Sequence, residues 1–213
     1  MKLFGHPMST CTRKVLALLA EKGQEAEFVL VDIMKGEGKQ PAHLARQPFG
    51  QIPAIDDDGF VLYESRAIIR YLDERLPGPS LTPKDLKARA LMEQWISVET
   101  SNFTPSAMKI VYQLFFGPMR GQQPDAKIVE EGRAGVTRAL AILDAQLAKT
   151  KFLVGDAFTL ADIAYMPYIE YVVAAKQGDL IAAHPNLARW WESIRSRPSW
   201  KKAIGTATAT AKA

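Results

Sequence analysis

The spacing of hydrophobic residues changes along this chain, and the first part alternates between two periods. A short apolar run at residues 2–5 is followed by Val15, Leu18 and Leu19, which have helical spacing. A second apolar run at residues 28–31 predicts a buried strand. A strand, a helix and a second strand in this order predict parallel pairing of the two strands, because the crossover helix brings the chain back to the end of the sheet at which the first strand began.

A hairpin and a helix are predicted next, after a loop at residues 34–50. Apolar positions at 54–55 and 61–63 flank Asp-Asp-Asp-Gly, which is typical of a tight turn. A helix then begins near Ser65, and its apolar face consists of Ile68, Ile69, Leu72 and Leu76. The order βαβ, loop, ββα predicts a small α/β domain.

Strand signals are absent after the Pro- and Gly-rich segment at residues 76–80. A helix is predicted from Thr82 to about Gly117 with a bend near Pro105, and Thr159 with Asp162 has the spacing of a capping box. Further helices are expected at 129–147, after Thr159, and from Pro185 to a stop at Pro198. We therefore expect an α/β domain at 1–78, an all-helical domain at 84–207 and a disordered tail at 208–213.

Composition narrows the class of protein. The 213 residues are 47% hydrophobic, with no apolar run near the roughly 20 residues that cross a bilayer. The N-terminus lacks the apolar core of a signal peptide, so a cytoplasmic location and no membrane partner are expected. The net charge of +4 is modest, and the basic patch at 195–202 is typical of a solvated helix end, so no nucleic-acid partner is expected. One cysteine and three scattered histidines predict neither a disulfide nor a metal site.

Residues suited to chemistry lie at three element ends of the first domain. Ser9 precedes the first helix, Pro53 precedes a strand, and Ser65 opens a helix. Each residue taken alone is more often an N-cap or a turn residue. Helix N-termini attract negative charge, however, and an X-Pro bond before an edge strand is a place where a cis bond exposes main-chain groups to a ligand. Three such ends in one small domain therefore indicate a binding site.

The motifs at these ends resemble those of glutathione transferases. Gly-His-Pro-Met-Ser at 5–9, Gln-Pro-Phe-Gly-Gln at 47–51 and Glu-Ser-Arg-Ala-Ile at 64–68 are similar to the phi class of that family. Residues 152–162 resemble the family's C-terminal signature, as do Trp190-Trp191-Glu192 and Arg197-Pro198. The resemblance implies a thioredoxin-like N-terminal domain, an all-α C-terminal domain and glutathione as co-substrate, with no metal.

The resemblance also implies a role for individual residues. Ser9 would stabilise the glutathione thiolate, which is the nucleophile that attacks a hydrophobic electrophile by aromatic substitution or Michael addition. The glutathione-binding residues would be Ser9, Lys39, Gln51, Ile52, Pro53, Glu64 and Ser65. Within this set, Ser65 and the helix N-terminus would take the γ-glutamyl carboxylate and Glu64 its ammonium group. Lys39 would bind the glycyl carboxylate, and Ile52 would pair its main chain with the cysteinyl unit before a cis Pro53.

Two further sites follow from the same resemblance. The second substrate would lie between the domains, against Met8, Tyr112, Phe115, Phe116 and Met119, although the helical-domain members are also typical of a core stripe. Phe49 resembles the aromatic key that phi-class enzymes insert into a partner subunit, which implies a homodimer.

Alternatives remain open at this stage. Gly38-Lys39 stands where the phi class commonly has His-Lys, which removes one donor near the glycyl carboxylate. Cys11 would support glutathione-dependent thiol transfer or peroxidase activity if it faced glutathione, although a small packing residue is the simpler interpretation. A carrier without turnover is the third alternative. The sequence does not name the electrophile, and detoxification, stress response and a catabolic step all fit.

Overall fold

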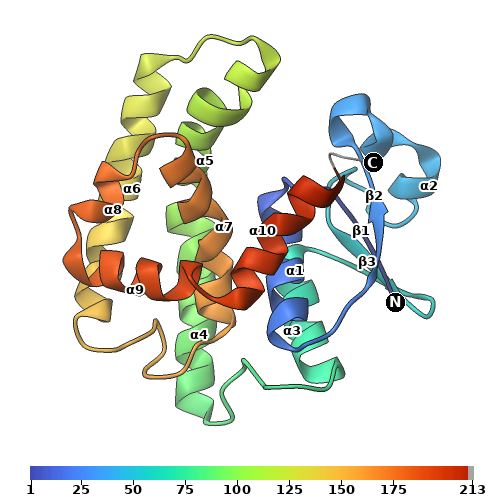
Figure 1. The fold of residues 1–213 in the computed structure, drawn as a ribbon, viewed down its shortest axis with the longest axis horizontal. Helices are drawn as coiled ribbons and strands as arrows, with labels where there is room; N and C mark the ends of the chain where they lie inside the picture. The colour runs from blue at the N-terminus through green and yellow to red at the C-terminus, as the bar shows by residue number, and fades with distance from the viewer. Residues whose placement is uncertain (211–213) are drawn as a thin grey trace. The chain divides into compact units, whose positions relative to one another are not determined.

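The computed structural model describes the main chain of residues 1–210 and the side chains of residues 1–205. The chain forms two compact units. The first consists of Met1–Thr82 together with the chain from Ser196 onward, and the second of Pro83–Arg195. Figure 1 shows the sheet and helices of the first unit and the helices of the second.

A four-stranded sheet forms the centre of the first unit. Its strands are β1 (Lys2–Gly5), β2 (Glu27–Leu30), β3 (Ala54–Asp57) and β4 (Phe60–Tyr63), in the order β2-β1-β3-β4. β1 pairs with β2 in parallel, whereas β3 is antiparallel to both β1 and β4. The predicted βαβ and ββα order is confirmed, and so is the parallel pairing of the first two strands.

The two faces of this sheet carry separate cores, because successive side chains of a strand point to opposite sides. Helices α1 (Thr10–Glu21) and α3 (Ser65–Arg75) pack on each other beside the sheet (Figure 1), and the strand residues Leu3 and Ile55 are fully buried. The predicted apolar face of α3 is confirmed for Ile68, Ile69 and Leu72, which are fully buried, whereas Leu76 follows the helix and is only partly buried. Burial of each such side chain contributes about 1.5–3 kcal/mol. On the other face Phe4 packs with Val31 and Ile52 in a smaller core.

The prediction of a buried second strand was wrong. β2 is an edge strand, and its residue Leu30 is 46% exposed, while the buried Val31 lies just after the strand. A continuous apolar run predicts cover on both faces, but an edge position leaves part of the strand open to solvent. The loop that follows contains two short 3₁₀ helices (Ile33–Lys35 and Glu37–Lys39) and α2 (Pro41–Leu44).

The second unit contains helices and no β-strand among its described residues, apart from one isolated bridge between Phe152 and Gly155. Its helices are α4 (Leu86–Val98), α5 (Thr104–Val111), α6 (Ala126–Leu147), α7 (Leu160–Ala174), α8 (Asp179–Ala182) and α9 (Pro185–Arg195), with π-helical turns at Glu99–Phe103 and Tyr112–Phe116 and a 3₁₀ turn at Pro118–Arg120. Near Pro105, where the sequence predicts a bend, a π-helical turn at Glu99–Phe103 lies directly before α5. The predicted start at Thr82 was wrong: the carboxylate of Asp85 accepts from the Ala88 N–H at 2.9 Å and caps α4 instead.

The predicted capping box at the start of α7 is confirmed. Asp162 is fully buried and accepts hydrogen bonds from the main-chain N–H of Thr159 at 2.8 Å and of Leu153 at 3.2 Å. The indole N–H of Trp190 donates to the same carboxylate at 2.8 Å. One aspartate therefore satisfies donors from the cap, the preceding loop and α9.

The sequence analysis placed the residues up to 207 in the helical domain and predicted no helix after Pro198, but a further helix begins at Pro198 and belongs to the first unit. α10 (Pro198–Thr210) packs against α1, side by side in Figure 1, so the helical unit ends at Arg195 and not at residue 207. Arg197 forms a bidentate ion pair with the Glu21 carboxylate at 2.6 and 2.7 Å, and the Ser199 hydroxyl donates to the same carboxylate. Of the tail predicted at 208–213, residues 208–210 are helical and residues 211–213 lie outside the described residues.

A buried ion pair holds the linker against the first unit. The Lys22 ammonium donates to the Asp73 carboxylate at 3.1 Å and to the main-chain oxygens of Asp73 and Pro79 at 2.7 and 3.1 Å. The same carboxylate accepts from the Leu81 N–H at 3.0 Å. Gly78 has φ +112° and a Cβ there would lie 2.6 Å from the Lys22 oxygen, so glycine is required. The linker at 76–80 therefore belongs to the first unit, which extends to Thr82.

Candidate active site

The three element ends singled out in the sequence meet at one end of the sheet. The register pairs Phe4 with Ala54 and Ala54 with Tyr63, across β1, β3 and β4. The loop to Ser9 leaves just after the first of these residues, Pro53 immediately precedes the second, and Glu64 immediately follows the third. Strand pairing, which is not visible in any one motif, brings these segments together.

Ser9 is the N-cap of α1. Its hydroxyl oxygen accepts from the Thr12 N–H at 3.2 Å, and its extended main chain has φ −73° and ψ 127°. The residue is partly exposed, and the hydroxyl hydrogen is left for a ligand because the cap uses only the oxygen. A donor hydroxyl and a helix N-terminus at one place form a site that stabilises an anion.

The loop before Ser9 is held by hydrogen bonds of its own. The Arg13 Nε–H donates to the Pro7 oxygen at 2.9 Å in a buried setting. The Met8 N–H donates to His6 Nδ1 at 3.2 Å, which places the ring proton of neutral His6 on Nε2, and the Ser9 N–H donates to the His6 oxygen at 2.9 Å. Ser9 is thus preorganised, and Arg13 is a supporting residue that the sequence interpretation did not single out.

Cys11 lies in the first turn of α1 and is partly buried. The Thr10 hydroxyl donates to its sulfur at 4.0 Å. Ser9 is the extended N-cap residue, whereas Cys11 lies inside the first helical turn. A small, partly buried thiol in a helical turn is typical of a packing residue.

The loop that contains the second motif is closely packed on the residues before it. The Lys39 ammonium donates to the Phe49 oxygen at 3.0 Å. A Cβ at Gly38 would lie 2.6 Å from the Gly50 oxygen, so the two main chains touch and no histidine fits at position 38 in this conformation. The predicted cis bond between Ile52 and Pro53 is present.

The third end carries two unusual features. Glu64 has φ +71°, a conformation that non-glycine residues rarely adopt and that occurs preferentially at functional sites. Ser65 opens α3, and its hydroxyl is buried without a hydrogen-bond partner among the described residues. An unsatisfied buried hydroxyl costs about 1–3 kcal/mol, so a ligand that bonds to it would remove this cost. Ser65 lies where the N-terminus of α3 favours an anionic group.

The predicted dimer key lies in the first unit, and the helical-domain residues predicted for the second-substrate pocket lie in the second. Phe49 is 64% exposed, with its ring edge-on to Tyr63 at 6.3 Å between centroids. In the second unit, Phe115 and Phe116 pack on Tyr171 with centroids 4.9 and 5.1 Å apart. Tyr112 contacts Phe116 from an exposed position, and Met119 is exposed. The buried Tyr171 completes the cluster. The sequence interpretation did not single it out, because α7 is apolar along most of its length and Tyr171 does not differ from its neighbours there.

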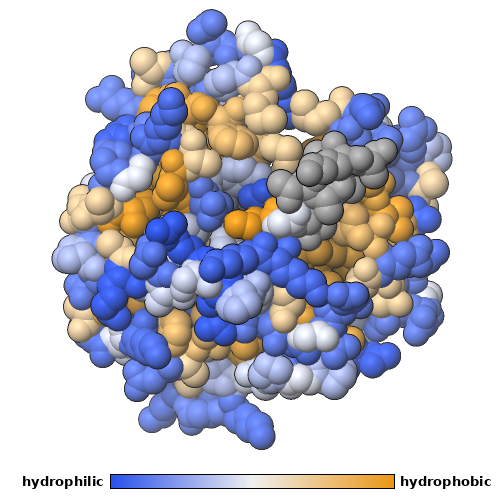
Figure 2. All heavy atoms as spheres, in the orientation of Figure 1, coloured by the Kyte–Doolittle hydropathy of each residue, from blue (hydrophilic) through white to orange (hydrophobic). Residues whose placement is uncertain are grey.

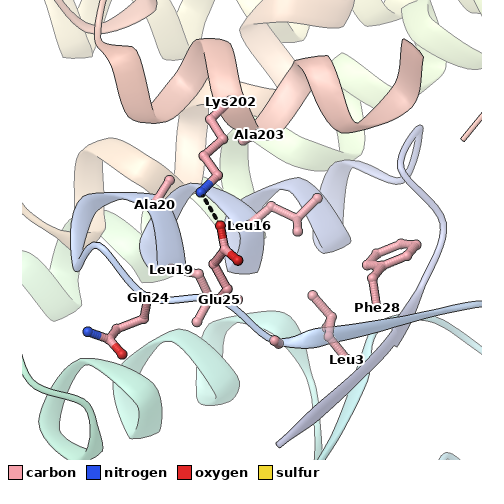
Figure 3. Close-up of a pocket in the computed structure, with 10 residues that line it drawn as sticks. Leu3, Leu16, Leu19, Ala20, Gln24, Glu25, Phe28, Lys202 and Ala203 are labelled. Carbon is pink, nitrogen blue, oxygen red and sulfur yellow. Dashed lines mark hydrogen bonds and ion pairs between the residues drawn. The ribbon is translucent and has the colours of Figure 1, made fainter. Parts of the chain in front are cut away.

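A separate pocket of about 160 Å³ lies between α1 and α10 (Figure 3). Its walls are mostly apolar, and Lys202 and Glu25 form an ion pair beside it at 2.7 Å. The residues that line it are Leu3, Leu16, Leu19, Ala20, Gln24, Glu25, Ala26, Phe28, Lys202 and Ala203. None of the predicted glutathione-binding residues is among them, so this pocket belongs to the packing of α10 and not to the candidate site.

The surface and the acidic, histidine and cysteine residues give no sign of a membrane span or a metal site in residues 1–210. Hydrophilic residues separate the hydrophobic patches on the face drawn in Figure 2. In residues 1–210 no helix is long and apolar enough to cross a membrane. The same part of the chain contains no group of three or more His, Cys, Asp or Glu residues arranged to hold a metal ion.

Comparison with known proteins assigns the fold to a family. Residues 1–74 match the model of the glutathione S-transferase N-terminal domain, and residues 103–198 match that of the C-terminal domain. The chain belongs to the glutathione S-transferase family. The predicted family, the thioredoxin-like and all-helical domains and the phi class are therefore confirmed.

Individual relatives match over almost the whole chain. Glutathione S-transferase 3 from Zea mays is 41% identical over 208 residues, covering 96% of this chain and 93% of its own. The crystal structure of glutathione transferase F7 from Populus trichocarpa has a TM-score of 0.92 at 40% identity and covers 97% of this chain and 98% of its own. Glutathione S-transferase I from maize, solved with an atrazine glutathione conjugate, has a TM-score of 0.90 at 33% identity, with 97% of each chain covered. Glutathione is the co-substrate of this family, and the chain is a glutathione transferase.

Proposed function

We propose that Ser9 activates the thiol of glutathione and that the thiolate attacks a hydrophobic electrophile. A free thiol has a pKa of about 8.5, so most of it is protonated at neutral pH. A hydrogen bond from the Ser9 hydroxyl to sulfur, together with the N-terminus of α1, favours the thiolate and lowers that pKa. Ser9 acts as a donor and not as a base, because its hydroxyl does not ionise near neutral pH.

The observation that carries this proposal is the buried Ser65 hydroxyl at the same end of the sheet as Ser9. Its missing partner is supplied by the γ-glutamyl carboxylate, held also by the N-terminus of α3, while exposed Glu64 binds the ammonium group. Gln51 holds the same end of glutathione, and the Ile52 main chain before cis Pro53 pairs with the cysteinyl unit. Lys39 binds the glycyl carboxylate. The thiol then falls next to Ser9, which is the group that the chemistry needs.

The proposal also gives this chain a dimer contact, a cellular location and an apolar surface for the second substrate. The exposed Phe49 ring is the contact of a symmetric homodimer. The protein acts in the cytoplasm. The aromatic cluster of Tyr112, Phe115 and Phe116, with exposed Met119, supplies apolar contacts to the electrophile.

The test is the ultraviolet absorbance of bound glutathione thiolate as a function of pH. In wild type the pKa of the bound thiol is expected below that of free glutathione. Ser9→Ala is expected to raise this pKa by about one to two pH units, the worth of one hydrogen bond to a charged group. The matched control, Cys11→Ala, leaves it unchanged. An unchanged pKa in Ser9→Ala, or a loss of thiolate in Cys11→Ala, would assign thiol activation to another group.

A further inference from the structure

One residue of the candidate site has both of its main-chain groups held by buried side chains. Gln51 lies in the stretch between α2 and β3, where no strand or helix supplies partners. The Gln47 side-chain oxygen accepts from the Gln51 N–H at 3.0 Å, and His43 Nε2 lies 2.7 Å from the Gln51 carbonyl oxygen. His43 is 4% exposed and Gln47 is 2% exposed. The Gln51 main chain is thus fixed by side chains that come from α2 and the turn after it.

This contact decides which ring nitrogen of His43 is the donor. A carbonyl oxygen only accepts, so Nε2 carries the proton and donates. Nδ1 is buried and has no hydrogen-bond partner in the described part of the chain. The imidazole therefore makes one hydrogen bond, to Gln51, and keeps a second polar atom buried without compensation. A residue that served packing alone would gain by being apolar at this position.

The hydrogen bond to Gln51 orients the next residue as well. The Gln51 carbonyl and the Ile52 N–H belong to one planar peptide group, so anchoring the oxygen fixes the direction of that N–H. Gln51 and Ile52 are the residues to which the proposed function assigns the γ-glutamyl end and the cysteinyl main chain of glutathione. We propose that His43 is a positioning residue for glutathione: it holds the Gln51–Ile52 peptide in the orientation that binds the tripeptide. This inference rests on the proposed function.

The proposal separates two effects. His43 acts on the loop that holds the backbone of glutathione, whereas Ser9 lies on the loop between β1 and α1. Loss of the His43 hydrogen bond is therefore expected to weaken the binding of glutathione without changing the pKa of the bound thiol. The KM for glutathione rises and kcat stays near its wild-type value once the site is saturated.

The experiment compares three variants of the full chain. His43→Phe keeps a planar ring and removes the donor, and His43→Gln places an amide nitrogen near the position of Nε2. His184→Phe is the matched control, since it changes a partly buried histidine of the other unit. For each protein we would measure glutathione binding by calorimetry, KM and kcat with an activated chlorobenzene, and the pKa of the bound thiol.

His43→Phe is expected to raise the Kd and the KM for glutathione about fivefold, the worth of one intramolecular hydrogen bond, with kcat and the thiol pKa unchanged. His43→Gln is expected to recover most of the loss, and His184→Phe to match wild type. An unchanged KM in His43→Phe, no recovery in His43→Gln, or an equal change in kcat and thiol pKa would overturn the proposal. If His43→Phe does not fold, His43→Asn replaces it, because its amide is too short to reach Gln51. Wild type that binds no glutathione would instead refute the proposed function.

Discussion

Replacement of Ser65 by alanine should change stability and binding in opposite directions. In the ligand-free protein the Ser65 hydroxyl is buried and has no partner in the described residues. Alanine removes this unsatisfied group and leaves only a small void, since serine and alanine differ by one oxygen atom. We expect the free energy of unfolding of ligand-free Ser65→Ala to equal that of wild type or to exceed it by up to about 1 kcal/mol.

Glutathione binding should weaken in the same variant. The hydroxyl is proposed to donate to the γ-glutamyl carboxylate, and a hydrogen bond to a charged group is worth about 1.5–3 kcal/mol. The dissociation constant should therefore rise by about 10- to 150-fold. Because a ligand stabilises the folded state in proportion to the logarithm of its concentration over Kd, the increase in Tm on adding glutathione should be smaller in Ser65→Ala than in wild type.

The assay is urea or thermal unfolding with and without glutathione, together with calorimetric binding. The matched control is Ser199→Ala, another buried serine, whose hydroxyl donates to Glu21. This control should lose about 1.5–3 kcal/mol of stability, because its hydrogen bond is to a charged group, and keep its glutathione affinity. The reasoning is refuted if Ser65→Ala is destabilised as much as the control while its affinity for glutathione is unchanged, since Ser65 would then have a structural role only.

Two other outcomes are expected from the same structure. Burial alone would raise the pKa of Glu21, but hydrogen bonds from Arg197 and Ser199 and the Arg197 charge hold that pKa below its usual 4.5. The ionised Glu21 therefore stabilises the folded state. This stabilisation is complete above pH 4.5 and is lost as the pH falls through the lower pKa of the folded state. Thermal unfolding against pH should show Glu21→Gln less stable than wild type at neutral pH and converging with it in acid; a constant gap would contradict this. Phe49→Ala should shift a dimer toward monomer in sedimentation, with a change in monomer stability within about 0.5 kcal/mol. The control Phe60→Ala, at an exposed fraction of 49%, should not; equal dissociation of both variants, or a monomeric wild type, would rule out Phe49 as the dimer contact.

Local features could be predicted from the sequence because they depend on neighbours in the chain. The Thr159–Asp162 capping box, Ser9 before α1 and the apolar face of α3 each follow from residue types at fixed short spacings. The family motifs extended this to the cis bond before Pro53, which chain-neighbour physics permits but does not require. These features survive in the fold because local preference and tertiary packing agree there.

The remaining features depend on contacts between residues far apart in the chain. The edge position of β2 and the register that joins Phe4, Ala54 and Tyr63 are properties of the assembled sheet. The attachment of α10 to α1 depends on Arg197 meeting Glu21 across most of the sequence.

Contacts between distant segments also decide whether each polar atom of the site has a hydrogen-bond partner. No pattern of spacing shows that the Ser65 hydroxyl lacks a partner, or that His43 reaches the Gln51 oxygen. The sequence by itself determined most of the helical segments, the caps at Ser9 and Thr159 and the family that supplies the chemistry. Tertiary structure alone decided which polar groups are satisfied and which are left for a ligand, because burial and hydrogen-bond partners exist only after distant segments have packed together.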